Sequence, residues 1–173
     1  MNATGEHAEP GGGGEAFRLL FVCTGNTCRS PLAQAVAAEE VRRRGWSQVE
    51  VHSAGVAAAQ GVPASPEAVR VATEAGLDLA QHRSSTLSQE EVERADLILA
   101  MSPSHLVELE RMGVKEKAAL ITVFAEGRED AEVSDRGVDD PIGGDREEYR
   151  RALHQLQRLV SRTLDRLEPV LAP

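Results

Sequence analysis

The chain has 173 residues, of which 41% are hydrophobic, and this is enough for one domain with a substantial core. It contains no apolar run long enough for a transmembrane helix, and its net charge of −9 argues against nonspecific binding to nucleic acid. Residues 1–16 are polar, small and rich in glycine, so we expect a flexible tail that lacks the basic start and apolar stretch of a secretory signal. We expect a single cytoplasmic domain over residues 17–173.

The first part of that domain alternates between a strand and a helix. The apolar run at 18–22 is short and bounded by turn residues, which predicts a buried strand. A helix should follow, with Ser30 as its N-cap, Pro31 in its first turn and Gly45 at its end. A second strand is expected over 49–55.

The remaining elements continue this alternation. Ser65 and Pro66 begin a helix that stops at Gly76, and Ser88 with Glu91 forms a capping-box signal before a short helix. The helix after Ser65 is expected to bury Val69, Ala72 and Ala75. Further expected elements are strands at 97–101 and 120–124, a helix at 104–112, a long acidic loop at 125–144 and a final helix at 145–167. The pattern predicts an α/β domain in which helices cover both faces of a four-stranded parallel sheet, with ligands at the carboxyl ends of the strands.

The most informative segment follows the first predicted strand and reads Cys23-Thr24-Gly25-Asn26-Thr27-Cys28-Arg29-Ser30. Cys23 ends the strand, and Arg29 begins the helix. The backbone between them is expected to curl into a ring of N–H donors at a helix N-terminus, which is a binding site for a tetrahedral oxyanion. The positive electrostatic potential of these N–H donors and of the helix N-terminus would also stabilise the thiolate of Cys23. A thiolate aimed at a bound phosphate is a nucleophile for phosphoryl transfer.

Structural explanations of the two cysteines are less specific. Cys23 and Cys28 could form a disulfide, contribute half of a zinc site or be two buried apolar thiols. Zinc needs about four ligands, and there is no other cysteine. The five histidines show no paired ligand spacing: His7, His52, His82, His105 and His154. We therefore expect no metal, and a reactive rather than structural role for the pair.

The predicted acidic loop supplies a proton donor for the leaving group. Asp140 precedes Pro141, which biases its backbone toward an extended conformation that could reach over a phosphate pocket. An acidic pair such as Asp139 and Asp140 is usually a solvated turn. Beside a nucleophilic loop, a catalytic role for Asp140 becomes the favoured interpretation.

These features together resemble the low-molecular-weight protein tyrosine phosphatase family. The resemblance covers nearly everything from Phe17 to the final helix. Its motifs appear in the family's order: 22–31, Ser53-Ala54-Gly55, His82 with Ser84-Ser85, 95–101 and Asp140-Pro141.

The resemblance implies a mechanism and a set of site residues. Cys23 would attack phosphorus to form a phosphocysteine, Arg29 would hold the phosphate oxygens, and Asp140 would protonate the leaving group and then activate water. The substrate loop would comprise Thr24, Gly25, Asn26, Thr27, Cys28 and Ser30, with Ser30 donating a hydrogen bond to the thiolate. Ser53 and His82 would join Asn26 in holding the loop in shape. Phosphorylated proteins are the implied partners, no cofactor is implied, and a monomer is the family default.

The motif details favour one branch of the family. Thr27 stands where tyrosine-directed members usually carry an apolar residue, and Asp-Pro-x-Gly-Gly at 140–144 resembles the bacterial protein-arginine phosphatases. Ile142 departs from that branch, where an aromatic residue is expected. We therefore expect phosphoarginine as substrate, with a protein-tyrosine phosphatase as the alternative. An arsenate reductase fits poorly because no cysteine follows Cys28, and a reversible Cys23–Cys28 disulfide is compatible with catalysis as regulation.

Overall fold

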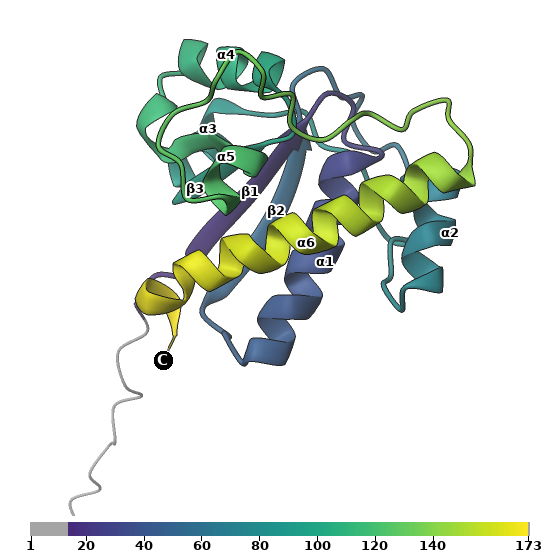
Figure 1. Ribbon diagram of the computed structural model, residues 1–173, viewed down its shortest axis with the longest axis horizontal. Coiled ribbons are helices and arrows are strands. Elements are labelled where there is room, and N and C mark those ends of the chain that lie inside the picture. The colour runs from purple at the N-terminus through teal and green to yellow at the C-terminus, as the bar shows by residue number, and fades with distance from the viewer. Residues whose placement is uncertain (1–13, 173) are drawn as a thin grey trace, which may run out of the picture.

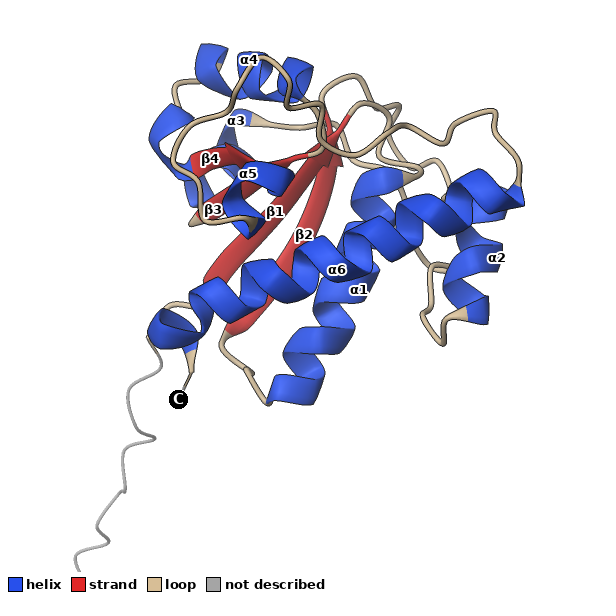
Figure 2. Ribbon diagram, in the orientation of Figure 1, coloured by secondary structure: helices blue, strands red, loops and turns tan. Residues whose placement is uncertain are grey.

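The computed structural model describes residues 14–172 and contains one parallel four-stranded sheet in the order β2-β1-β3-β4 (Figures 1 and 2). The strands are β1 (Phe17–Cys23), β2 (Val49–Gly55), β3 (Leu97–Ala100) and β4 (Ala118–Leu120). The helices are α1 (Arg29–Arg44), α2 (Pro66–Glu74), α3 (Gln89–Arg94), α4 (Pro103–Arg111), α5 (Ile121–Ala125) and α6 (Arg146–Leu171), with one 3₁₀ turn at Lys115–Lys117. The predicted fold class is confirmed. Most of the expected tail, residues 1–13, lies outside the described residues.

Alternating side chains of β1 are buried against different helices on the two faces of the sheet. Leu19 and Phe21 belong to the larger core cluster, together with residues of α1, α2, α5 and α6. Leu20 and Val22 belong to a second cluster, with residues of α3 and α4. Because successive strand residues point to opposite faces, a nearly continuous apolar run is what a strand buried on both faces requires.

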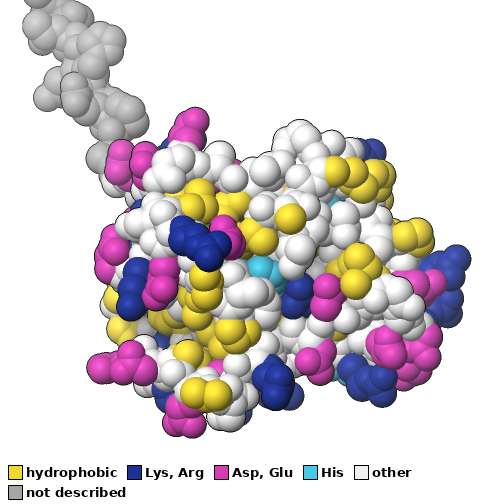
Figure 3. All heavy atoms as spheres, turned by 90° about the horizontal axis from the view of Figure 1, so that it is seen from above, with side chains coloured by type: hydrophobic (Ala, Val, Ile, Leu, Met, Phe, Trp, Pro, Cys, Tyr) yellow, Lys and Arg dark blue, Asp and Glu magenta, His cyan; other side chains and the backbone are white. Residues whose placement is uncertain are grey.

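The strand register brings the functional loops to one edge of the sheet. Cys23 pairs with Gly55 at the end of β2, and Val22 pairs with Ala100 at the end of β3. Figure 1 shows the loops after these strands gathered at that edge, with part of the segment between α5 and α6 passing over it. Figure 3 views the molecule from this side, where acidic and basic side chains are interspersed around a central histidine.

The strand predicted over 120–124 is wrong. β4 ends at Leu120, and the apolar run continues as α5, in which Ile121, Val123 and Ala125 are buried. The neighbouring β3 ends at Ala100, the residue that pairs with Leu120, so no partner strand remains beyond this point. Backbone groups that lose a ladder must find other hydrogen bonds, and a helical turn supplies them locally.

The predicted roles of two other segments also need correction. Ser30 is not the N-cap of α1, because the helix begins at Arg29 and Cys28 occupies the cap position. In α2 the buried residues are Ala68, Val71 and Ala72, whereas Ala75 is exposed, because the 3–4 spacing that faces the core starts at residue 68.

The long C-terminal helix confirms the predicted core stripe. Its six predicted positions, Tyr149, Leu153, Leu156, Val160, Leu164 and Leu167, are all buried. The helix extends four residues beyond the predicted end to Leu171, which is itself buried and so favours continuing the helix past Pro169. None of the described helices has the length and apolar character needed to cross a membrane.

Candidate active site

The thiol of Cys23 is buried at the centre of the loop that joins β1 to α1. The hydroxyl of Ser30 lies 2.8 Å from Cys23 Sγ, and the backbone N–H of Asn26 donates to the same sulfur at 3.2 Å. Asn26 Nδ2 donates to Ser30 Oγ at 2.8 Å, which leaves the Ser30 hydrogen free to point at the sulfur. Ser30 can therefore donate to the sulfur of Cys23, and a negative charge on that sulfur would be stabilised by two hydrogen bonds.

Asn26 is the residue that holds this loop in shape. It is fully buried and has a positive φ of 54°, a region that asparagine tolerates better than most residues. Its side chain donates to Ser53 Oγ at 3.0 Å and accepts from the Ser85 N–H at 2.9 Å. Its carbonyl lies 2.8 Å from Nε2 of His82. The structure thus brings the two predicted supporting residues, Ser53 and His82, against Asn26.

Gly55 is a further requirement of the loop that sequence reasoning did not assign to the site. A Cβ built on Gly55 would overlap the carbonyl oxygen of Thr24 and lie 3.0 Å from Asn26 N. Its position opposite Cys23 in the β1–β2 register explains why only glycine fits.

Replacing Gly55 with alanine is expected to lower kcat/KM about 10²-fold, because displacing the backbone at Thr24 and Asn26 would misplace the N–H groups that are predicted to bind phosphate. Hydrolysis of an aryl phosphate would be measured beside far-UV circular dichroism, which should show that the sheet and helices remain. Wild-type rates in a folded variant would contradict this account of Gly55.

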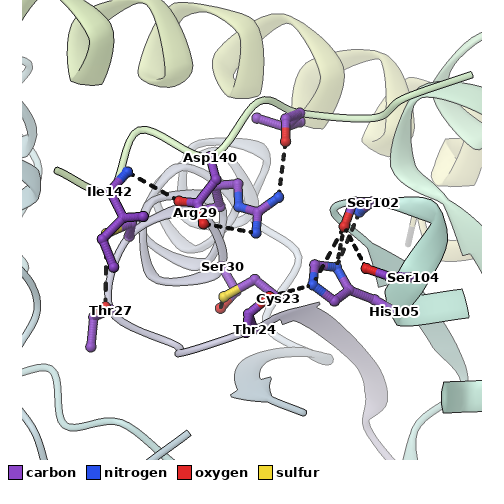
Figure 4. Close-up of polar contacts among 12 residues, drawn as sticks. Cys23, Thr24, Thr27, Arg29, Ser30, Ser102, Ser104, His105, Asp140 and Ile142 are labelled. Atoms are coloured by element: carbon purple, nitrogen blue, oxygen red, sulfur yellow. Dashed lines mark hydrogen bonds and ion pairs between the residues drawn. The ribbon is translucent and has the colours of Figure 1, made fainter. Parts of the chain in front are cut away.

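Arg29 connects the loop to the segment that carries the expected acid. Its side chain is almost completely buried, Nη1 donates to the carbonyl of Val138 at 3.0 Å, and Nη2 lies 3.4 Å from Asp140 Oδ2 (Figure 4). The other carboxylate oxygen of Asp140 accepts from the Ile142 N–H at 3.1 Å. The Arg29 guanidinium thus brings Asp140, the predicted acid, to the loop of Cys23, the predicted nucleophile, although these two residues are far apart in the chain.

The segment before Asp140 is fixed by its own contacts. Val138 N–H donates to the carbonyl of Met101 at 2.8 Å, and a Cβ on Gly137, whose φ is 75°, would overlap that same carbonyl. Arg128 and Asp135 form a two-pronged ion pair at 2.9 and 2.6 Å. These contacts place the acidic loop across the end of β3 and so hold Asp140 over the Cys23 loop.

Cys28 points away from the site. Its sulfur lies 3.4 Å from Ser65 Oγ and 3.4 Å from the hydroxyl of Tyr149 on α6. Burial, followed by the hydrogen bond to Cys28, raises the pKa of Tyr149 to about 12. Both cysteines are free thiols. The side chain of Cys28 therefore packs behind the loop, which leaves only its backbone N–H for the predicted binding of phosphate.

His105 is the second residue at the site, after Gly55, that sequence reasoning missed. It is buried in the first turn of α4, Nε2 lies 2.9 Å from Thr24 Oγ1, and Nδ1 accepts from the Ser102 N–H at 3.1 Å. Burial is the main cause that lowers the pKa of His105 to about 4; the positive charge of Arg29 adds to the effect and Asp140 opposes it. The position of His105 just after the carboxyl end of β3 was the available signal.

His105 is expected to contribute to the loss of folding stability at acidic pH. Between pH 6.5 and about 4 the unfolded chain binds a proton at this residue and the folded chain does not. The free energy of unfolding should therefore decrease as the pH is lowered through this window, and the loss should reach about 3 kcal/mol at the lower end. Urea titrations at several pH values would measure this, and His105→Asn should show a shallower slope. Equal slopes would contradict the assignment.

The family profile described as low molecular weight phosphotyrosine protein phosphatase matches residues 18–170. The chain is a member of this phosphatase family. In the low-molecular-weight phosphatase described here, residues 14–172 contain no group of three or more His, Cys, Asp or Glu side chains arranged to hold a metal ion.

Relatives of this phosphatase fall into two groups by name. It is 40% identical over 154 residues to a protein-arginine-phosphatase of Geobacillus stearothermophilus, covering 88% of this chain and 97% of that one. It is 36% identical over 149 residues to a probable low molecular weight protein-tyrosine-phosphatase, EpsP, of Ralstonia solanacearum, covering 86% and 94%. A cysteine-to-serine mutant of YwlE arginine phosphatase with a phosphorylated active site serine superposes with a TM-score of 0.80 at 34% identity, covering 88% of this chain and 96% of that one.

Proposed function

We propose that this phosphatase hydrolyses phosphorylated proteins through a phosphocysteine, and that phosphoarginine is its preferred substrate. The observation that carries the proposal is the site itself: a buried Cys23 thiol held by donors, with Arg29 and Asp140 3.4 Å apart beside it. The roles given to these residues are part of the proposal.

The reaction proceeds in two displacements. The Cys23 thiolate attacks phosphorus, an S–P bond forms, and the P–N bond of phosphoarginine breaks as Asp140 transfers its proton to the leaving nitrogen. Water then attacks the phosphocysteine, Asp140 takes a proton from that water, and the S–P bond breaks to release phosphate and the thiolate.

The negative charge on the transferring phosphoryl group is stabilised by donor groups that are already fixed in place. The planar fork of Arg29 suits two phosphate oxygens, and the N–H groups of residues 24–29 supply further donors. Asn26 holds that loop through contacts with four other residues, so little reorganisation is needed when phosphate binds.

The preference for phosphoarginine is supported by the composition of the pocket rim. All five aromatic residues lie in the described part of the chain, and none lines this rim; Tyr149, on α6, reaches the loop only from behind, at Cys28. Thr27 is polar and half-buried, and Ile142 is 66% exposed. A phenyl ring gains most from flat apolar walls, whereas a guanidinium group gains from oxygen acceptors and a carboxylate.

The deciding experiment is turnover of two peptides that differ only in carrying phosphoarginine or phosphotyrosine, without added metal. We expect a higher kcat/KM for phosphoarginine, and a reduced preference in Thr27→Ile. A higher value for phosphotyrosine would favour the alternative, a protein-tyrosine phosphatase, for which the exposed Ile142 offers an apolar contact. Activity toward neither peptide would reject both substrates.

The setting of the enzyme belongs to the same proposal. A buried nucleophilic thiol that is free suits a reducing compartment, so we place the enzyme in the cytoplasm, acting as a monomer on phosphoproteins. Sedimentation analysis tests the monomer, and cell fractionation tests the compartment.

A further inference from the structure

The contact between Thr24 and His105 has no role in the two displacements described above. Thr24 directly follows the nucleophile, and its side chain is exposed at the rim of the site. His105 lies 81 residues further along the chain, is 1% exposed, and points its Nε2 at the Thr24 hydroxyl. His105 also caps α4, because its Nδ1 contacts the backbone N–H and the hydroxyl of Ser102, but its contact with Thr24 lies outside that helix.

The hydrogen bonds of His105 fix which atom donates. The backbone N–H of Ser102 can only donate, so Nδ1 of His105 must be an acceptor and carries no proton. The proton of the neutral ring is then on Nε2, and Thr24 Oγ1 accepts it. The Thr24 oxygen keeps one further lone pair, held in a defined direction at the rim.

The surroundings keep His105 neutral. Burial and the nearby cation of Arg29 both disfavour a charged imidazole, and its pKa of about 4 leaves it uncharged at neutral pH. His105 therefore orients an oxygen acceptor at this part of the rim without adding a second cation to that of Arg29. Figure 4 shows Thr24 and His105 on the side of Cys23 opposite to Thr27 and Ile142, with Arg29 and Asp140 between the two sides.

We infer that His105 is a positioning residue for substrate specificity, which orients the Thr24 hydroxyl to accept an N–H from the guanidinium group of phosphoarginine. The inference rests on the proposed function. Thr24 and Thr27 then supply oxygen atoms on two sides of the leaving group, and Asp140 supplies the carboxyl group that protonates it. A phosphotyrosine ring carries no N–H donor at this position and gains nothing from the oriented lone pair.

Two substitutions of His105 separate this role from its structural one. Asparagine places an acceptor near the position of Nδ1, so it keeps the Ser102 contact but does not reach Thr24. Glutamine places an N–H donor near the position of Nε2, so it keeps the contact to Thr24. Thr24→Val removes the hydroxyl with little change in volume at an exposed position, and it provides the same test if a His105 variant fails to fold.

The measured quantity is the ratio of kcat/KM for the phosphoarginine peptide to that for the matched phosphotyrosine peptide. We expect His105→Asn and Thr24→Val each to lower this ratio about tenfold, mainly through KM, which is the effect of losing one hydrogen bond to a charged group. The double variant should lose no more than either single variant, and His105→Gln should retain most of the ratio.

Each outcome has a distinct meaning. If the wild-type enzyme prefers phosphoarginine but His105→Asn and Thr24→Val slow both peptides equally, the two residues are structural and the inference is wrong while the proposed function stands. If the wild-type enzyme acts only on phosphotyrosine, the proposed function fails and the inference fails with it.

Discussion

Replacing Cys23 with serine is expected to abolish steady-state hydrolysis, with a loss of at least about 10⁴-fold in kcat. The hydroxyl of serine is far less acidic than a thiol, so the hydrogen bonds from Ser30 and Asn26 cannot produce an anionic nucleophile at neutral pH. The volume changes little, and the fold should remain intact. Turnover of a phosphopeptide, with circular dichroism as the check on folding, measures the effect.

Cys28 provides the matched control for this experiment. It lies in the same loop and is equally buried, but its sulfur faces Ser65 and Tyr149 rather than the site. Cys28→Ser should therefore cost far less activity than Cys23→Ser. Comparable losses from both variants would mean that the nucleophile has been assigned wrongly or that the loop collapses whenever either thiol is changed.

The second large effect is expected from Asp140→Asn, which should lower kcat for phosphoarginine by about 10²–10⁴-fold. Asparagine can still accept the Ile142 N–H and contact Arg29, so the loop should keep its shape and lose only the transferable proton. The loss should be smaller for para-nitrophenyl phosphate, whose leaving group departs readily without protonation. Rates for both substrates would be measured across pH.

Asp139→Asn is the neighbouring control, because it removes the same charge one residue away. If Asp140 acts as the acid, its variant alone should show a loss that depends on the leaving group. If both variants reduce kcat for the two substrates by the same factor, the negative charge of the loop matters and proton transfer by Asp140 does not.

The sequence alone determined the features that depend on neighbouring residues. The strand end at Cys23, the helix start at Arg29 and the glycine and asparagine between them mark, in seven consecutive positions, the loop that is predicted to bind an oxyanion. The capping box at Ser88 and Glu91 is present as predicted, because both of its hydrogen bonds close within one turn. Apolar runs also predicted three of the four strands closely, since each pairs along most of its length.

The tertiary structure decided which contacts form between residues that are distant in the chain. Whether the run after Leu120 continued as a strand depended on where β3 ended. Ser30 contacts the sulfur of Cys23 rather than capping a helix, because the loop folds back onto Cys23. Arg29 meets the carbonyl of Val138 across 109 residues, and Thr24 meets His105 across 81. Such contacts follow from packing both faces of the sheet, and no local spacing encodes them. Local sequence specified the chemistry of the phosphate loop, and the fold specified which side chains surround it.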